Sequence, residues 1–196
     1  MIHNAVIDNI LDRRSIRAYT EEPLTQEELD TLLECAVWAP SSMNRQTTKY
    51  VAVQNKELMA LLAEDDKKFM QAPPPMPGMP KPGEVPGGPG PGPMGERKLA
   101  YGAPCVILIF DTPEMGGKTI NAPLGEMNIC LAANSMGLGT CILGAMGAFN
   151  DAANAELWKE RLGIPAEYQY ITCVAVGHPA KPGKPGPRKE ERKIIR

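Results

Sequence analysis

The chain has 196 residues, of which 43% are hydrophobic, a composition typical of one globular domain with a substantial core. Its formal net charge is −2, so the protein lacks the overall positive field that would attract nucleic acid or an anionic membrane surface. The apolar runs, such as the one at 106–110, are too short to span a bilayer, and the first residues show neither the basic nor the apolar region of an export signal. The five cysteines are scattered and none lies in a CxxC pair, a pattern typical of buried thiols in a reducing compartment. We therefore expect a cytoplasmic protein with no nucleic-acid or membrane partner.

Helix signals dominate the first third of the chain. Apolar residues recur with helical spacing over 3–13, which predicts an amphipathic helix. Thr25 begins a capping box that opens a second helix, and this helix ends before Pro40. A strand is expected at 50–53, and Asn55 is placed to cap a third helix directly after it.

Strands and helices follow one another less regularly in the second half of the chain. A continuous apolar run at 106–110 predicts a buried central strand. A buried helix is expected at 125–136, where Gly137 ends it, followed by a short helix at 152–162 and a buried strand at 170–176. Because helices and strands mix without a strict strand–helix rhythm, we expect an α+β fold, with one domain over 1–196.

The segment at 72–95 has a different composition from the rest. Its 24 residues include ten prolines, seven glycines and three methionines. Missing amide donors and high backbone entropy prevent such a segment from forming a helix or a sheet, so it is a long loop or polyproline-like flap. It is either a functional lid or disordered. Its methionines could bind a soft metal, but with no nearby histidine or cysteine we predict no metal site.

Two polar segments indicate a binding site. Residues 13–17 place three guanidiniums and a hydroxyl within five positions, and residues 39–46 form a polar turn about two dozen residues later. Arginine forks match phosphate oxygens in pairs, and a serine hydroxyl adds a further donor. The two segments are therefore interpreted as two walls of a site for a phosphate-bearing ligand with a polar ring. A basic pentamer on its own is more often a solvated surface.

The order of motifs along the chain resembles that of the FMN-dependent nitroreductase superfamily. The resemblance covers nearly the whole chain except the insert at 72–95, and it rests on five segments, at 13–19, 39–46, 137–144, 174–179 and 187–189. It implies a central mixed β-sheet flanked by helices and an interlocked homodimer with two FMN sites, each built from both subunits. The insert lies where family members place variable lids over the flavin.

The resemblance also implies roles for individual residues. The phosphate and ribityl chain of FMN would be bound by Arg13, Ser15, Arg17 and Arg188, and the pyrimidine side of the ring would be approached by Arg14. The turn that lines the flavin from the other subunit would consist of Pro40, Ser41 and Ser42, and the amide of Asn44 would hydrogen-bond the edge of the flavin ring. The backbone near the reactive N5 atom of the flavin would belong to Leu143 and Gly144, where Leu143 is apolar although some family members carry an acidic residue.

The function implied by this resemblance is an oxidoreductase without a catalytic side chain of its own. Hydride would pass from NADH or NADPH to flavin N5, and the electrons would then pass to a nitroaromatic, quinone or similar small molecule by a ping-pong mechanism. Two alternatives stay open. The same fold could perform other flavin chemistry, such as dehalogenation, flavin fragmentation or heterocycle oxidation, or the protein could be a non-enzymatic flavin-binding or redox-sensing protein.

Other polar residues are given structural interpretations. Glu126 and Asn128 fall in an otherwise apolar helix, and because buried polar groups need partners, a network across a dimer interface is favoured over a place in the site. The charged run at 65–68 is most simply a solvated helix end.

Overall fold

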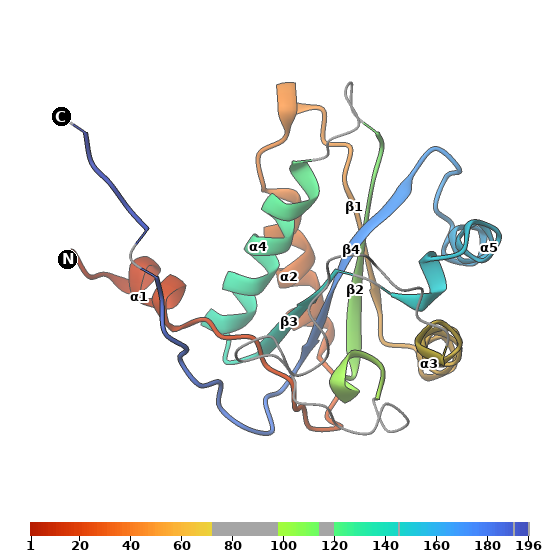
Figure 1. The fold of residues 1–196 in the computed structure, drawn as a ribbon, viewed down its shortest axis with the longest axis horizontal. Coiled ribbons are helices and arrows are strands. Elements are labelled where there is room, and N and C mark those ends of the chain that lie inside the picture. The colour runs from red at the N-terminus through yellow and green to blue at the C-terminus, as the bar shows by residue number, and fades with distance from the viewer. Residues whose placement is uncertain (72–97, 114–119, 145, 190, 196) are drawn as a thin grey trace.

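The computed structural model describes residues 1–71, 98–113, 120–144, 146–189 and 191–195 (Figure 1). The expected flap at 72–95 lies outside the described residues. The helices are α1 (Ala5–Asp12), α2 (Gln26–Val37), α3 (Lys56–Gln71), α4 (Asn121–Ser135) and α5 (Ala152–Leu162), with short 3₁₀ turns at Ser42–Asn44, Leu99–Gly102 and Gly147–Phe149. The strands are β1 (Lys49–Val53), β2 (Cys105–Asp111), β3 (Gly139–Leu143) and β4 (Gln169–Gly177).

The expected helix starts are confirmed in atomic detail. The Thr25 hydroxyl accepts a hydrogen bond from the Glu28 amide at 3.2 Å, while the Glu28 carboxylate accepts one from the Thr25 amide at 2.7 Å. The Asn55 side chain caps α3 by accepting from the amide of Leu58 at 3.0 Å. Two boundaries differ from expectation. Helix α4 begins at Asn121 rather than at 125, and β3 forms where no strand was predicted.

The sheet has the strand order β1-β2-β4-β3, and every neighbouring pair is antiparallel. The expectation of a mixed sheet is therefore wrong for the strands that the structure describes. A parallel contact occurs only as an isolated bridge between Ser15 and Thr140, on the open edge of β3. Strand direction depends on how the connecting helices cross the sheet, and a strand's own residues carry no signal for it.

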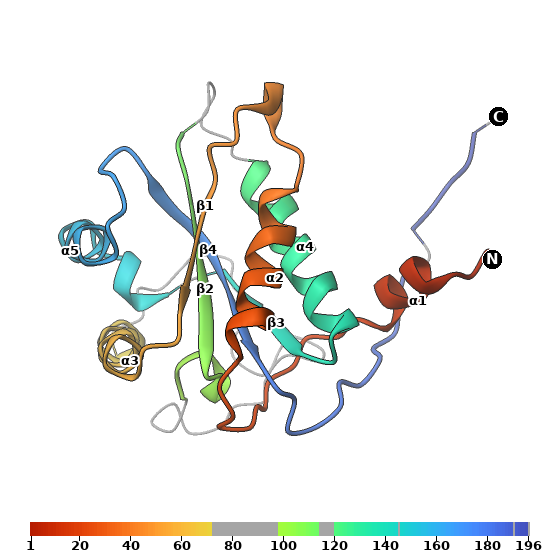
Figure 2. The same cartoon turned by 180° about the vertical axis from the view of Figure 1, so that it is seen from behind.

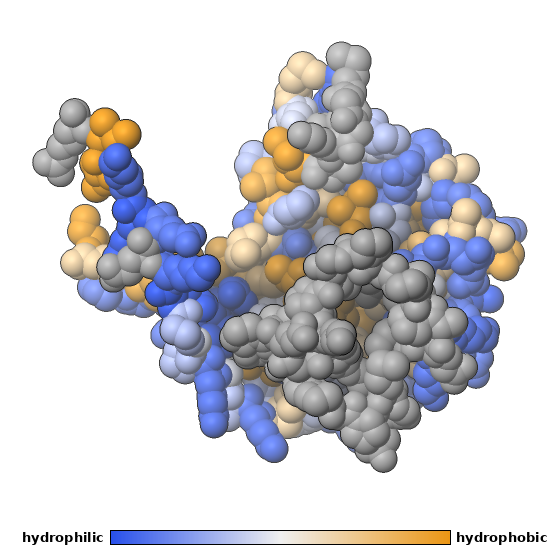
Figure 3. Space-filling view, in the orientation of Figure 1, coloured by the Kyte–Doolittle hydropathy of each residue, from blue (hydrophilic) through white to orange (hydrophobic). Residues whose placement is uncertain are grey.

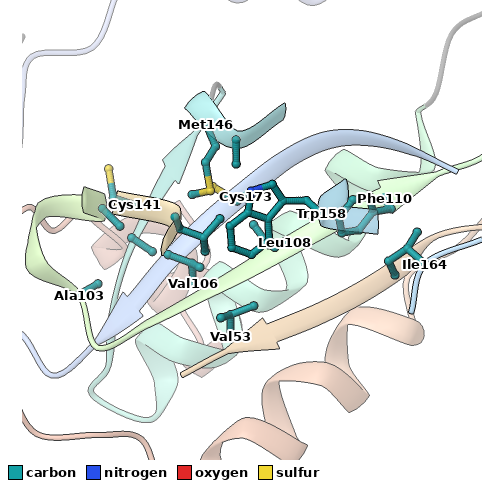
Figure 4. Packing of buried hydrophobic residues seen from close by; sticks show 14 residues of the cluster. Val53, Ala103, Val106, Leu108, Phe110, Cys141, Met146, Trp158, Ile164 and Cys173 are labelled. Carbon is teal, nitrogen blue, oxygen red and sulfur yellow. The ribbon is translucent and has the colours of Figure 1, made fainter. Parts of the chain in front are cut away.

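Helices cover both faces of this sheet, and this explains the apolar runs in the central strands. Helices α2 and α4 lie on one face and α3 and α5 on the other (Figures 1 and 2). Successive side chains of a strand point to opposite faces. Val106 and Leu108 of β2 thus pack with Trp158 in the core beside α5 (Figure 4), while Ile107 and Ile109 pack beneath α2 and α4. All seven residues of β2 are buried, which confirms the predicted central strand.

The charged run at 65–68 is more than a solvated helix end. Asp65 accepts hydrogen bonds from the indole of buried Trp158 at 2.8 Å, from Asn154 at 3.1 Å and from Lys68 at 2.9 Å. Asp66 accepts from the amide of Gly147 at 3.1 Å. The end of α3 therefore holds α5 and the loop after β3 in place. Sequence reasoning missed this role because the partners lie about 80 to 90 residues away in the chain.

These contacts predict a specific acid sensitivity. Burial alone would raise the pKa of Asp65, but its hydrogen bonds from Trp158, Lys68 and Asn154 outweigh burial, and the pKa is lowered from its ordinary value of 3.8. A carboxyl with a depressed folded-state pKa stabilises the fold above its unfolded-state value, and this stability is lost as the pH falls through the folded-state value. Asp65→Asn should lower the free energy of unfolding by about 1–2 kcal/mol at neutral pH and flatten its decline below about pH 5.

Urea denaturation at a series of pH values measures both quantities. The matched control is Asp30→Asn, which removes an exposed carboxylate of α2 that accepts one side-chain hydrogen bond, from Gln26 at 2.8 Å. An equal pH dependence in Asp65→Asn and the unmodified protein would contradict the assignment.

Candidate functional site

The basic segment at 13–17 is fixed to the edge of β3. The amide of Ile16 donates to the carbonyl of Thr140 at 2.8 Å, and the Ile16 side chain is 7% exposed. A Cβ atom at Gly139 would lie 2.7 Å from the Ile16 side chain, so only glycine admits this close approach. Because Ile16 points inward, its neighbours Ser15 and Arg17 point outward and are exposed.

The three guanidiniums of this segment have different surroundings. Arg17 lies over the ring of Tyr101, 5.8 Å from its centre. Arg14 turns back onto the end of α1, where it donates to the carbonyl oxygens of Leu11 at 2.5 Å and of Arg13 at 2.8 Å. Burial raises the pKa of the Cys141 thiol, and the nearby positive charges of Arg17 and Arg13 oppose that shift. Arg13 and Arg17 thus share one electropositive neighbourhood, whereas Arg14 is held by backbone oxygens.

The C-terminal tail runs along the same segment. The amide of Ala180 donates to the carbonyl of Ala18 at 2.9 Å, and a Cβ atom at Gly183 would lie 2.3 Å from the Arg14 side chain. In both ribbon views the tail passes beside α1 (Figures 1 and 2), and Figure 3 shows mostly hydrophilic residues there, with apolar residues at the two termini. The tail therefore brings its own basic residues, Lys181, Lys184, Arg188 and Lys189, to the side of the molecule that carries Arg13 and Arg17.

The polar turn at 40–46 has an unusual backbone. Met43, Asn44 and Gln46 all adopt positive φ values of 52–53°, a conformation that side-chain-bearing residues rarely adopt. The Ser41 hydroxyl stabilises the turn by accepting from the Gln46 amide at 2.9 Å, and the Ser42 amide donates to Asn121 at 3.0 Å. Strained backbone of this kind is concentrated at functional sites.

A pocket of about 110 Å³ opens beside this turn. It combines apolar and polar side chains, which are Val37, Ala39, Pro40, Ser41, Gln46, Thr48, Tyr50 and Asn121. Of these, Pro40 and Ser41 were predicted as site residues, and Ala39 and Gln46 lie in the predicted wall at 39–46. Asn121 was missed because the helix was expected to begin later, although Pro123 marks the first turn of α4. Tyr50 was missed because its place in a strand indicates only a half-buried sheet position, and Thr48 lies just before β1.

The two predicted walls do not meet within one chain. The basic segment borders Thr140, which pairs with Val176 near the end of β4. The turn is followed by Thr48, whose hydroxyl donates to Asp111 at the opposite end of the sheet. The two positions are about six strand residues apart, or roughly 20 Å. The orange turn and α1 lie far apart in both ribbon views (Figures 1 and 2). Within one chain the two predicted walls are therefore separate surfaces.

The Leu143–Gly144 segment lies between these ends, at the last residue of β3. Leu143 pairs with Cys173 of β4, and its carbonyl oxygen is 3.3 Å from the Thr172 hydroxyl. Gly144 is exposed, and a Cβ atom there would meet nothing within 4 Å. The Leu143–Gly144 peptide is therefore contacted by Thr172 on its carbonyl side and is exposed at Gly144.

The polar residues of α4 find partners within the chain. Glu126 is 7% exposed and accepts a hydrogen bond from Thr172 at 2.7 Å. Asn128 donates to the carbonyl of Cys35 at 2.9 Å. Both groups thus have hydrogen-bond partners in neighbouring elements of the same chain, and a network across a dimer interface stays a prediction.

Comparison with known proteins identifies the family. The chain belongs to the Nitroreductase family, whose model matches residues 10–178. A crystal structure of a nitroreductase with bound FMN from Desulfitobacterium hafniense DCB-2 is 29% identical, with a TM-score of 0.82 and coverage of 100% of both chains. An FMN reductase (NADPH) of Bacillus subtilis strain 168 is 29% identical over 94% of this chain and 70% of that protein. An FMN reductase (NAD(P)H) of the same strain is 46% identical, but over 61 residues, which are 31% of this chain and 24% of that protein. Within the described residues, no helix is both long and apolar enough to cross a membrane.

Proposed function

We propose that the protein is a homodimeric, FMN-dependent oxidoreductase that takes hydride from NADH or NADPH and passes electrons to nitroaromatic, quinone or similar acceptors by a ping-pong mechanism. The observation that carries the proposal is the convergence of the segment at 13–17 and the C-terminal tail on one electropositive edge of the molecule, along the strand β3 that ends at the open Leu143–Gly144 peptide. The bound FMN of the Desulfitobacterium nitroreductase and the names of the Bacillus reductases support the cofactor and the hydride donor.

The chemistry of the residues present fits FMN. A phosphate carries nearly two negative charges, and the guanidiniums of Arg13, Arg17 and Arg188 with the Ser15 hydroxyl are a donor set suited to it. Backbone donors at Leu143 and Gly144 suit the carbonyl and nitrogen acceptors at the edge of a flavin ring. When bound, FMN would supply the hydride chemistry. The protein would orient the ring, balance the phosphate charge and control access.

The turn at 40–46 would contact the flavin of the partner subunit. Its separation from the basic segment within one chain supports a site shared by two copies, with Pro40, Ser41, Ser42 and Asn44 lining the ring. In this arrangement Arg14 would approach the pyrimidine side only after leaving the backbone oxygens that it now contacts. We also propose that the segment at 72–95 selects acceptors, and that the protein is cytoplasmic.

The absorption spectrum of the purified protein tests the proposal. Flavin bands that bleach on anaerobic addition of NADPH or NADH, and return when a nitroaromatic or a quinone is added, are the expected result. Parallel reciprocal plots in the steady state would agree with a ping-pong mechanism, whereas intersecting plots would contradict it. A bound flavin that neither nucleotide reduces would favour the other flavin chemistries or the non-enzymatic sensor.

A further inference from the structure

A buried carboxyl lies behind the peptide that faces the proposed flavin. Glu126 of α4 is 7% exposed, and one of its carboxyl oxygens is 2.7 Å from the Thr172 hydroxyl of β4. That hydroxyl is also 3.3 Å from the carbonyl oxygen of Leu143. No lysine, arginine or histidine of the described residues lies within ion-pairing distance of this carboxyl. Glu126, Thr172 and Leu143 therefore form a short polar chain from α4 through β4 to β3.

The Thr172 hydroxyl has one proton, so it can donate a good hydrogen bond either to the Glu126 carboxyl or to the Leu143 carbonyl, but not to both. When Glu126 is ionised, the shorter and charge-assisted contact takes that proton, and the Leu143 carbonyl loses the Thr172 donor and keeps the weak thiol donor of Cys173, whose sulfur is 3.7 Å away. When Glu126 is protonated, it can donate to the Thr172 oxygen, and the hydroxyl can then turn to donate to the Leu143 carbonyl. Protonation of Glu126 thus reverses the direction in which the hydrogen bonds between Glu126, Thr172 and Leu143 are donated.

The Leu143 carbonyl shares a planar trans peptide with the amide of Gly144, so the two groups point in opposite directions. The carbonyl points toward Thr172, and the Gly144 N–H therefore points away from β4, toward the open side. A hydrogen bond to a peptide carbonyl polarises the peptide and strengthens its N–H as a donor. The protonation state of Glu126 consequently changes the donor strength of the outward-facing Gly144 N–H, through the single peptide that joins Leu143 and Gly144.

We propose that Glu126 is a positioning residue, which through Thr172 sets the strength of the Gly144 N–H as a hydrogen-bond donor to the edge of the flavin ring. This inference rests on the proposed function. It predicts that the protonated form of Glu126 binds oxidised FMN more tightly than the ionised form.

The surroundings of Glu126 favour a neutral carboxyl. Burial raises its pKa above the ordinary value of 4.5, and the hydrogen bond from Thr172 only partly opposes the shift. The ionisable groups that interact with it are Cys130 on α4 and Tyr170 and Cys173 on β4, and the latter two also interact with Asp66 of α3. Burial raises the pKa of all three groups, so they stay uncharged where Glu126 titrates.

The test is a titration of the FMN-free protein with FMN, followed by fluorescence, between about pH 5 and pH 9. Glu126→Gln mimics the protonated state, since its amide can donate to Thr172, whereas Thr172→Val breaks the chain and Thr172→Ser keeps it. The ratio of the dissociation constants of the unmodified protein and Glu126→Gln cancels the titration of the FMN phosphate. We expect this ratio to be near one at the acid end and to rise to about threefold to tenfold at the alkaline end.

A double variant separates the hydrogen-bonded chain from simple charge repulsion. In the Thr172→Val background, Glu126→Gln should change the FMN affinity by less than about twofold at any pH, and Thr172→Ser should restore the pH-dependent ratio. Glu160→Gln removes one exposed carboxylate from α5 on the other face of the sheet and serves as the charge-matched control. Infrared difference spectra between the FMN-free protein and Glu126→Gln should show a protonated carboxyl band that disappears as the pH rises.

The outcomes distinguish the two proposals. Failure of the unmodified protein to bind FMN would overturn the proposed function. Normal FMN binding with a pH-independent ratio, or a pH-dependent ratio that persists in the Thr172→Val background, would overturn the role of Glu126 and leave the proposed function intact. Should Thr172→Val not fold, Thr172→Ala removes the same hydroxyl and takes its place in the double variant.

Discussion

Replacing Arg17 by alanine is expected to weaken FMN binding by about 10- to 100-fold, the loss typical of one charge-assisted hydrogen bond to phosphate. Arg17 is exposed, lies over the Tyr101 ring and points outward because its neighbour Ile16 is buried against β3. Its guanidinium interacts with the Cys141 thiol but fills no position in the core, so the free energy of unfolding should change by less than about 1 kcal/mol. Fluorescence titration with FMN and urea denaturation measure the two effects separately.

Arg161→Ala is the matched control for this substitution. Arg161 is likewise an exposed arginine over an aromatic ring, 4.6 Å from the centre of Trp158, but it lies on α5, away from the proposed site. We expect it to leave FMN affinity unchanged within about twofold. Equal losses in Arg17→Ala and Arg161→Ala would mean that general electrostatics, and not a phosphate contact, explains the effect. Unchanged flavin content in Arg17→Ala would remove Arg17 from the site.

Mixing two inactive variants should restore FMN binding if each site is shared by two subunits. One variant carries Arg13→Ala and Arg17→Ala, and the other carries Asn44→Asp. Aspartate tolerates the positive φ of 52° at this position but replaces an amide donor with a negative charge. Each heterodimer would contain one intact site and one doubly altered site. Random reassortment therefore restores about one quarter of all sites.

The measurement is flavin content after the two proteins are unfolded together, refolded with FMN and separated by gel filtration. Each variant refolded alone provides the baseline, and differently tagged chains show that heterodimers have formed. Heterodimers without recovered flavin would show that both walls of the site belong to the same chain. Thr140 and Asp111 lie toward opposite ends of the sheet, and this separation is our argument for a shared site. Such a result would overturn that argument.

Local physical signals account for the parts of the fold that could be predicted. Thr25 and Asn55 accept from amides that have no partner within their helices, so a few neighbouring residues are enough to predict these helix starts. The apolar run of β2 predicted a strand buried on both faces, because polar residues would be needed on any face that met water. Residues 13–17 could be recognised as basic and phosphate-compatible for the same reason, since that property belongs to the side chains themselves.

The site required information that no local segment carries. The contact of the tail with residues 14–18, the hydrogen bonds of Asp65 and the chain from Glu126 to Leu143 each join residues that are far apart in the sequence. Position 126 was favoured as part of a dimer network because a polar residue in an apolar helix indicates only that some partner exists. The identity of that partner depends on which strand packs beneath the helix.

The sequence by itself determined most of the elements, the apolar faces that they bury and the basic character of one segment, because capping, periodicity and charge act over a few residues. Only the tertiary structure decided that the four strands are all antiparallel, that the two polar segments lie near opposite ends of the sheet, and that a buried carboxyl stands behind Gly144. These features follow from how helices cross and cover the sheet, and that packing is a property of the whole chain.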